Sequence, residues 1–159
     1  MIILGIDPGY GTLGYGVIKK ERGVCAHIEN GAIITPKTDR FPERLKFIAE
    51  KIEELLAKYS PDAVAIEELF FNTNQKTAIM VAEARGVVLV TVERASIPLF
   101  EYTPIQIKLS LTGYGRADKN QIQQMVKMVL HLPEIPKPDD AADALACALT
   151  HAQTNTKML

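Results

Sequence analysis

The chain has 159 residues, of which 47% are hydrophobic and 23% charged, a balance typical of a single globular domain. Its formal net charge of -1 excludes the overall basic character of many nucleic-acid-binding proteins, so any contact with DNA must depend on a local patch. The two isolated cysteines exclude a disulfide framework and a zinc site, and no apolar run is long enough to span a membrane. We therefore expect a soluble, cytoplasmic protein.

An apolar run at the start of the chain leads directly into a carboxylate. Residues 2–6 are apolar or glycine, Asp7 follows at once, and a glycine-rich turn then precedes a second apolar run. This pattern predicts a buried strand that carries Asp7 at its end, followed by a hairpin. Asp7 alone is explained equally well as a turn-forming residue, so a functional interpretation requires further carboxylates.

Two more strands and a helix are predicted next. The strands cover residues 15–19 and 24–35, lie on either side of a polar turn, and complete an antiparallel meander of three. Residues 41–59 then repeat apolar side chains at helical spacing until a Ser-Pro pair stops the pattern. This segment is the clearest helix in the sequence.

A second apolar run, residues 63–66, also ends in a carboxylate, that of Glu67. It has the same pattern as the first strand and comes after the helix. A strand, helix, strand crossover places two strands side by side and parallel. We therefore expect Asp7 and Glu67 to meet at one edge of the sheet.

A long helix over residues 72–95 is predicted before a strand over residues 97–102. The valine-rich stretch 87–92 resembles a strand by itself, but the next strand follows without room for a turn. A helix that is apolar around its whole circumference must be covered on more than one side, and we expect a partner subunit there. Gly86 costs this helix about 1 kcal/mol relative to alanine, which is tolerable if it allows a close approach.

The last part of the chain is predicted to contain three helices, over residues 103–111, 118–130 and from 139 or 140 to 152. Without any internal repeat or second core, residues 1–153 are expected to form one domain, with 154–159 as a frayed tail. Four basic side chains make the region before the terminal helix locally positive: Lys108, Arg116, Lys119 and Lys127.

Two carboxylates occur on one face of the terminal helix. Asp140 and Asp143 are three residues apart, so their like charges destabilise the helix unless a cation neutralises them. An acid at a helix start also complements the helix dipole, which accounts for Asp139 and in part for Asp140. Asp143 lies deeper in the helix, where this explanation is weaker.

The four acids Asp7, Glu67, Asp140 and Asp143 would form a site with oxygen ligands only. Such a site suits Mg²⁺ or Mn²⁺, because it contains no histidine or cysteine ligand. Two metal ions about 3.5–4 Å apart are a known arrangement for attack of water on a phosphodiester. Catalysis of this kind needs no protein nucleophile, and no Ser-His or Cys-His pattern is present.

Five motifs occur in order along nearly the whole chain: Gly-Ile-Asp-Pro-Gly at 5–9, Gly-Tyr-Gly-Val-Ile at 14–18, Ala-Ile-Glu at 65–67, Ala-Arg-Gly-Val at 84–87 and Asp-Ala-Ala-Asp-Ala-Leu at 140–145. In these motifs and their intervals the sequence resembles the RuvC family of Holliday junction resolvases.

The resemblance implies an α/β protein of the ribonuclease H-like fold, with a five-stranded mixed sheet and helices on both faces. It implies a homodimer that nicks two opposed strands of a four-way DNA junction, with Mg²⁺ as cofactor, and a branch-migration complex as partner. The family's catalytic acids match Asp7, Glu67, Asp140 and Asp143. Glu68 and Asp139 are additional acids beside these positions, and either could contribute to the site or be merely solvated.

Contacts with DNA are assigned by the resemblance. Phe70 matches an aromatic residue that stacks at the junction crossover. Without the resemblance, the pair Phe70 and Phe71 would be interpreted as core residues. Lys108 and Lys119 match phosphate-contacting positions, and Arg116 could join them, although lysines on helices are usually only solvated.

Two other functions compete with junction cleavage. One is an ATP-binding domain of the actin, Hsp70 and sugar-kinase type, whose first strand also ends in an aspartate. That class needs two such domains and leaves the Asp140 and Asp143 pair without a purpose. The other is a junction-binding protein that has lost cleavage, but all four acids are present here.

Overall fold

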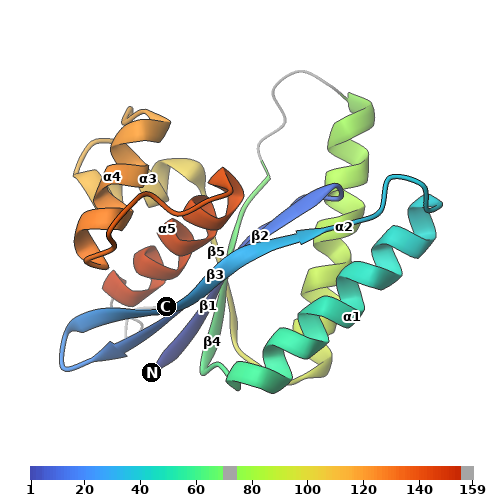
Figure 1. Ribbon diagram of the computed structural model, residues 1–159, viewed down its shortest axis with the longest axis horizontal. Helices are drawn as coiled ribbons and strands as arrows, with labels where there is room; N and C mark the ends of the chain where they lie inside the picture. Colours follow the sequence, from blue (N-terminus) through green and yellow to red (C-terminus); the bar gives the residue numbers. More distant parts are fainter. Residues whose placement is uncertain (70–74, 155–159) are drawn as a thin grey trace.

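A computed structural model describes residues 1–69 and 75–154, and in it five strands form one mixed sheet. The strand order is β3-β2-β1-β4-β5, antiparallel from β3 to β1 and parallel from β1 to β5, as predicted (Figure 1). The strands are β1 (Ile2–Asp7), β2 (Thr12–Glu21), β3 (Val24–Ile34), β4 (Ala63–Glu67) and β5 (Leu99–Tyr102).

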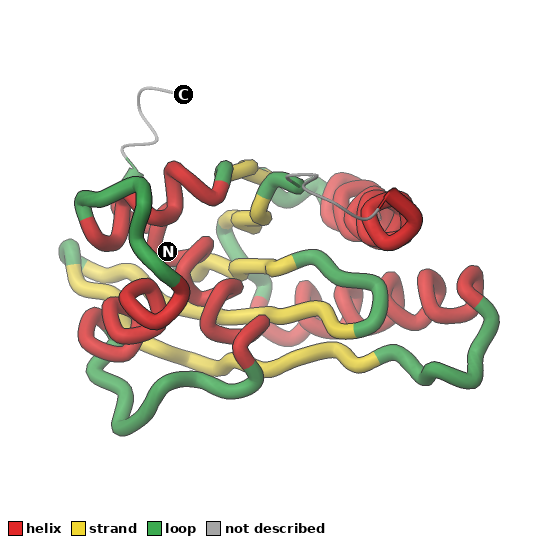
Figure 2. Tube along the Cα trace, turned by 90° about the horizontal axis from the view of Figure 1, so that it is seen from above, coloured by secondary structure: helices red, strands yellow, loops and turns green. Residues whose placement is uncertain are grey.

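Helices cover both faces of the sheet, and each face has its own apolar core (Figure 1). On one face lie α1 (Phe41–Tyr59) and α2 (Gln75–Arg94), and α2 is seen end-on in Figure 2. On the other lie α3 (Pro104–Thr112), α4 (Lys119–Val129) and α5 (Asp139–Gln153). No helix in the described ranges is long and apolar enough to cross a membrane.

The strand boundaries differ from those predicted in the first hairpin. β2 begins at Thr12, before the predicted 15–19, because it pairs with β3 along its full length. Two glycines early in β2 interrupt its apolar pattern, which is why the sequence concealed this part. β3 ends at Ile34, and the N–H of Thr35 instead bonds to the carbonyl of Gly11 at 3.0 Å.

The valine-rich segment is helical, as predicted, within α2. Its side chains at Val88 and Val92 are fully buried in the core that α2 shares with α1 and the sheet. Packing therefore overrides the strand preference of β-branched residues. Residues 72–74 of the predicted helix lie outside the described ranges, as do residues 155–159 of the predicted tail.

Helix α5 lies unusually close to the strands beneath it. A Cβ atom at Gly5 of β1 would overlap the carbonyl oxygen of Ala144, and one at Gly14 of β2 would overlap that of Asp140. Only glycine at these two positions lets the helix backbone reach the sheet. This close approach brings the first turn of α5 to the end of β1.

Candidate active site

Asp7 and Glu67 end two adjacent parallel strands. The last paired residues of β1 and β4 are Ile6 and Ile66, so both acids come directly after them. Side chains alternate along a strand, and both carboxylates lie on the sheet face that α5 covers, like Gly5 and Ala65. The crossover predicted from the sequence therefore brings these two acids together.

The first turn of α5 supplies the other two predicted acids. Asp140 and Asp143 are half-buried, and their charges act on the carboxyl group of Asp7. Asp143 also lines a pocket of about 180 Å³ together with Glu67, Lys108 and Lys119. The structure thus gathers the four acids from β1, β4 and α5 into one cluster.

Two acids of this cluster, Asp7 and Glu67, hold their protons unusually tightly. Burial, and then the charges of Glu67, Asp143 and Asp140, raise the pKa of Asp7 to about 8. Burial and the Asp143 charge raise the pKa of Glu67 to about 7, while the nearby lysines 108 and 119 oppose this rise. Such shifts are typical of sites whose function depends on clustered charge.

Lys119 is the countercharge of the cluster. Its Nζ lies 3.0 Å from Oδ2 of Asp143 and 3.5 Å from Oδ2 of Asp139. The residue is the first of α4, whose start is fixed by Asp118, because the Asp118 carboxylate accepts the N–H of Gln121 at 2.8 Å. Burial raises the pKa of Asp143, and the bond from Lys119 limits that rise.

The donor set fits a hard divalent cation. Its ligands would be carboxylate oxygens, and no donor in the described ranges hydrogen-bonds to the carboxyl groups of Asp7 or Glu67. Within residues 1–69 and 75–154, no three acidic, histidine or cysteine side chains are yet close enough to share an ion. The Asp143 carboxylate is instead paired with Lys119, and like charges among the acids repel one another.

The predicted DNA-contacting residues have different positions. Lys108 lines the pocket beside Glu67, whereas Arg116 is exposed in the turn before α4 and does not line it. Phe70 and Phe71 lie outside the described residues. Asp139 differs from the four predicted acids, since Lys137 at 3.1 Å and Lys119 lower its pKa.

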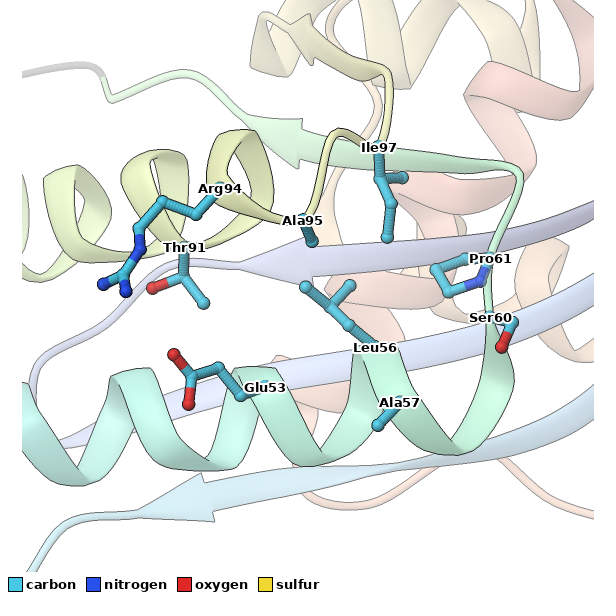
Figure 3. A pocket seen from close by; sticks show the side chains of 9 residues that line it. All are labelled: Glu53, Leu56, Ala57, Ser60, Pro61, Thr91, Arg94, Ala95 and Ile97. Atoms are coloured by element: carbon cyan, nitrogen blue, oxygen red, sulfur yellow. The ribbon is translucent and has the colours of Figure 1, made fainter.

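A further groove, of about 540 Å³, lies between the C-terminal parts of α1 and α2 (Figure 3). Glu53 and Arg94 point toward each other across its mouth, and Leu56 and Ile97 form part of its apolar wall (Figure 3). Its lining includes Pro61, which precedes β4, so it is at the opposite end of the parallel strands from the acids. The groove is therefore separate from the carboxylate cluster.

A family model described as crossover junction endodeoxyribonuclease RuvC matches residues 3–151. The chain belongs to the RuvC family.

Relatives in the RuvC family match almost the whole chain. The crossover junction endodeoxyribonuclease RuvC of Alkaliphilus oremlandii is 56% identical over 154 residues, which cover 97% of this chain and 94% of that protein. That of Thermosipho melanesiensis is 56% identical over 148 residues, with 93% and 94% covered.

Solved RuvC structures have the same fold. Thermus thermophilus RuvC superposes with a TM-score of 0.90 at 38% identity, covering 99% of this chain and 96% of that one. The same protein in complex with a Holliday junction substrate gives a TM-score of 0.89 at 36% identity over the same shares. These comparisons confirm both the resemblance to the RuvC family and the ribonuclease H-like fold predicted from the sequence.

The sequence interpretation assigned no site role to Arg85, although it lies within one of the RuvC motifs, at 84–87. Its side chain reaches from α2 to the carbonyl of Glu67 and to the carboxylate of Glu101 on β5. Spacing could not reveal this contact, because it joins three different elements, β4, α2 and β5, whose packing on one another leaves no periodic signal.

Proposed function

We propose that this chain is an endonuclease that resolves four-way DNA junctions by hydrolysing phosphodiester bonds in two opposed strands. The observation that carries the proposal is the convergence of Asp7, Glu67 and the two α5 acids at one edge of the sheet. The family supports the choice of substrate, since the Thermus thermophilus relative is described in complex with a Holliday junction substrate.

In this proposal the four acids hold Mg²⁺ ions, with Mn²⁺ as a substitute. When bound, the metal supplies an activated water and stabilises the departing oxygen. The protein's own contribution is position: β1 and β4 fix Asp7 and Glu67, and the first turn of α5 adds Asp140 and Asp143. Metal binding requires these carboxyl groups to lose their protons.

Basic residues around the cluster would hold the DNA backbone. Lys108 lies beside Glu67 in the pocket, and Lys119 is already in contact with Asp143. The Lys119 ammonium, which pairs with Asp143 here, would be placed to pair with a phosphate of the DNA backbone. Arg116 is exposed next to α4 and could extend the phosphate track, while base stacking is proposed for Phe70 from the family pattern.

Two symmetric nicks require two such sites, which we assign to a homodimer formed through α2. The helix exposes Ile79 (61%) and Val90 (54%), and a Cβ at Gly86 would meet open space. These three residues, with Glu83, follow the 79, 83, 86, 90 spacing of one helix stripe. A second α2 could approach closely at Gly86, which explains a glycine inside a helix.

Two further features of the proposal come from the family. A branch-migration complex would deliver the junction, and cleavage would take place in the cytoplasm. Neither is needed for the chemistry at the carboxylate cluster.

Nicking of a synthetic four-way junction tests the proposed function. The wild-type protein with Mg²⁺ is expected to nick opposed strands of the junction, and to leave linear duplex and an RNA/DNA hybrid uncut. Asp7→Asn should abolish nicking and retain junction binding, because it removes one ligand without changing the shape. Glu21→Gln, at the exposed end of β2, is the matched control and should nick normally.

Three outcomes would contradict the proposal. Junction binding without any nicking by the wild type would favour a binding protein. Cleavage of the hybrid in preference to the junction would indicate an RNA-cutting enzyme of the same fold. Unchanged nicking by Asp7→Asn would exclude the carboxylate mechanism.

A further inference from the structure

The acid Glu67 is held in place from the opposite face of the sheet. Arg85, in the middle of α2, donates from Nε to the main-chain carbonyl of Glu67 at 3.4 Å. Its Nη2 forms an ion pair with Oε2 of Glu101 on β5. The Arg85 side chain is 16% exposed, whereas that of Glu101 is 45% exposed, so the guanidinium is shielded from water and the carboxylate that holds it is not.

The bridge joins the point where β4 leaves the sheet. β4 pairs with β1 only as far as Ile66, so the sheet does not restrain Glu67 on that side. On the other side, the next N–H, of Glu68, bonds to the carbonyl of Tyr102 at 2.9 Å. The hydrogen bond from Arg85 therefore adds a restraint on the Glu67 peptide, at the residue that must present its carboxylate accurately.

Arg85 contacts the main chain of Glu67 and not its carboxylate. The Glu67 side chain points to the α5 face, toward Lys108 and Lys119, whereas Arg85 approaches from the α2 face. Besides burial, the charged groups that act most on the Glu67 carboxyl group are Asp143, which raises its pKa, and the two lysines, which lower it, and all of them lie on the α5 face. Its contribution is thus to the direction of the Glu67 Cα–Cβ bond.

We propose that Arg85 is a positioning residue that clamps the end of β4 to α2 and β5 and so holds Glu67 in its catalytic orientation. This inference rests on the proposed nuclease function. It also gives α2 a second role, because the helix assigned above to the dimer interface then fixes a residue of the active site.

Single-turnover nicking at saturating junction and Mg²⁺ tests the proposal. Arg85→Ala is expected to slow nicking by about 10–100-fold, the usual cost when the support of a metal ligand is lost or a reacting group is misplaced. Junction affinity and its dependence on salt should not change. Arg94→Ala removes an exposed arginine from the end of the same helix and should nick like the wild type.

Arg85→Lys separates geometry from charge. A lysine keeps the positive charge but cannot bridge two acceptors as a guanidinium does, so its rate should remain well below that of the wild type. Full activity of Arg85→Lys would overturn the clamp. Weaker junction binding by Arg85→Ala, with a smaller salt dependence, would also overturn it, because that result identifies a phosphate contact.

Two measurements do not depend on nicking. The affinity for Mn²⁺, measured by calorimetry without DNA, should fall about 10–100-fold in Arg85→Ala, and hydrogen exchange at the Glu68 amide should become faster. If the wild type fails to nick, the proposed function fails, and these two measurements still test the clamp. If Arg85→Ala does not fold, Glu101→Gln takes its place, because this variant weakens the same bridge. It should give smaller changes of the same kind. A Glu101→Gln protein with unchanged Mn²⁺ affinity and hydrogen exchange would then overturn the clamp.

Discussion

Gly14 lies directly beneath the carbonyl oxygen of Asp140, with no space for a Cβ atom between strand and helix. The same glycine is paired with Asp7 across the β1–β2 ladder. One residue without a side chain thus determines how closely the first turn of α5 approaches the end of β1. The distance between the acids of the two elements depends on this contact.

Replacing Gly14 by alanine is expected to move α5 away from the sheet. The overlap with Asp140 should cost about 1–3 kcal/mol of the free energy of unfolding, as other overpacked sites do. The nicking rate of the folded protein should also fall, because the acids of α5 move away from Asp7. Thermal melting and a junction assay measure the two effects.

Gly115→Ala is the control for this substitution. A Cβ there would lie 3.5 Å from Cγ2 of Ile105, an ordinary contact, so neither stability nor nicking should change. Equal nicking by Gly14→Ala and the wild type would show that the site tolerates a displaced α5.

The stability of the metal-free protein should decrease as pH rises. The pKa of Asp7 is raised from 3.8 to about 8, so the folded protein binds more protons than the unfolded chain throughout this interval. The free energy of unfolding therefore falls between about pH 4 and pH 8, and Glu67, with a pKa of about 7, adds to the decrease. Melting in the presence of a chelator measures this dependence.

Asp7→Asn should flatten this pH dependence and make the metal-free protein more stable than the wild type above about pH 8. Each kcal/mol of relieved repulsion raises the melting temperature by roughly 2–4 °C in a chain of this size. If the free energy of unfolding changed with pH in the same way in both proteins, Asp7 would not be the group that titrates. The affinity of the wild type for Mg²⁺ should rise over the same interval, because binding displaces protons.

Removing Lys119 is expected to have opposite effects on metal binding and on nicking. Without the positive charge of Lys119, the cluster attracts both protons and divalent cations more strongly. The attraction energy increases more for the divalent cation than for a competing proton, because the cation carries twice the charge. Lys119→Ala should therefore bind Mn²⁺ more tightly in calorimetry but nick more slowly. Lys137→Ala, which loses a pairing with Asp139 only, should leave both quantities close to those of the wild type. Weaker Mn²⁺ binding by Lys119→Ala would contradict the countercharge role.

A charge on the exposed stripe of α2 should produce monomers. Val90→Glu places a carboxylate in the proposed interface, whereas Val24→Glu changes a valine on β3 that is more exposed (65% against 54%). Sedimentation at micromolar concentration should show a monomer for the first variant and a dimer for the second and for the wild type. A monomeric wild type would exclude the interface.

Gly86→Ala tests the close approach of two helices. In a lone helix this change adds about 1 kcal/mol of stability, and a Cβ at Gly86 meets nothing within one chain. If two α2 helices cross there, the methyl group should weaken the dimer while the folded monomer becomes more stable. A dimer of unchanged or greater strength would place the crossing elsewhere.

Much of the site could be predicted from the sequence because its pattern is local. The apolar runs that end at Asp7 and Glu67 indicate strands, and the helix between them forces those strands to be parallel and adjacent. The spacing of Asp140 and Asp143 places them on one helix face without any knowledge of the fold. Each of these inferences uses residues that are close together in the chain.

The remaining features depend on contacts between distant segments, and only the tertiary structure decided them. The tight packing of Gly14 against α5, the ion pair of Lys119 with Asp143 and the bridge from Arg85 to Glu67 leave no periodic signal. Pattern and spacing report the face on which a side chain lies, whereas protonation and orientation depend on what packs against that face. The sequence by itself determined which acids form the cluster, and the packing of α5, α4 and α2 around the two strand ends decided their charge and their direction.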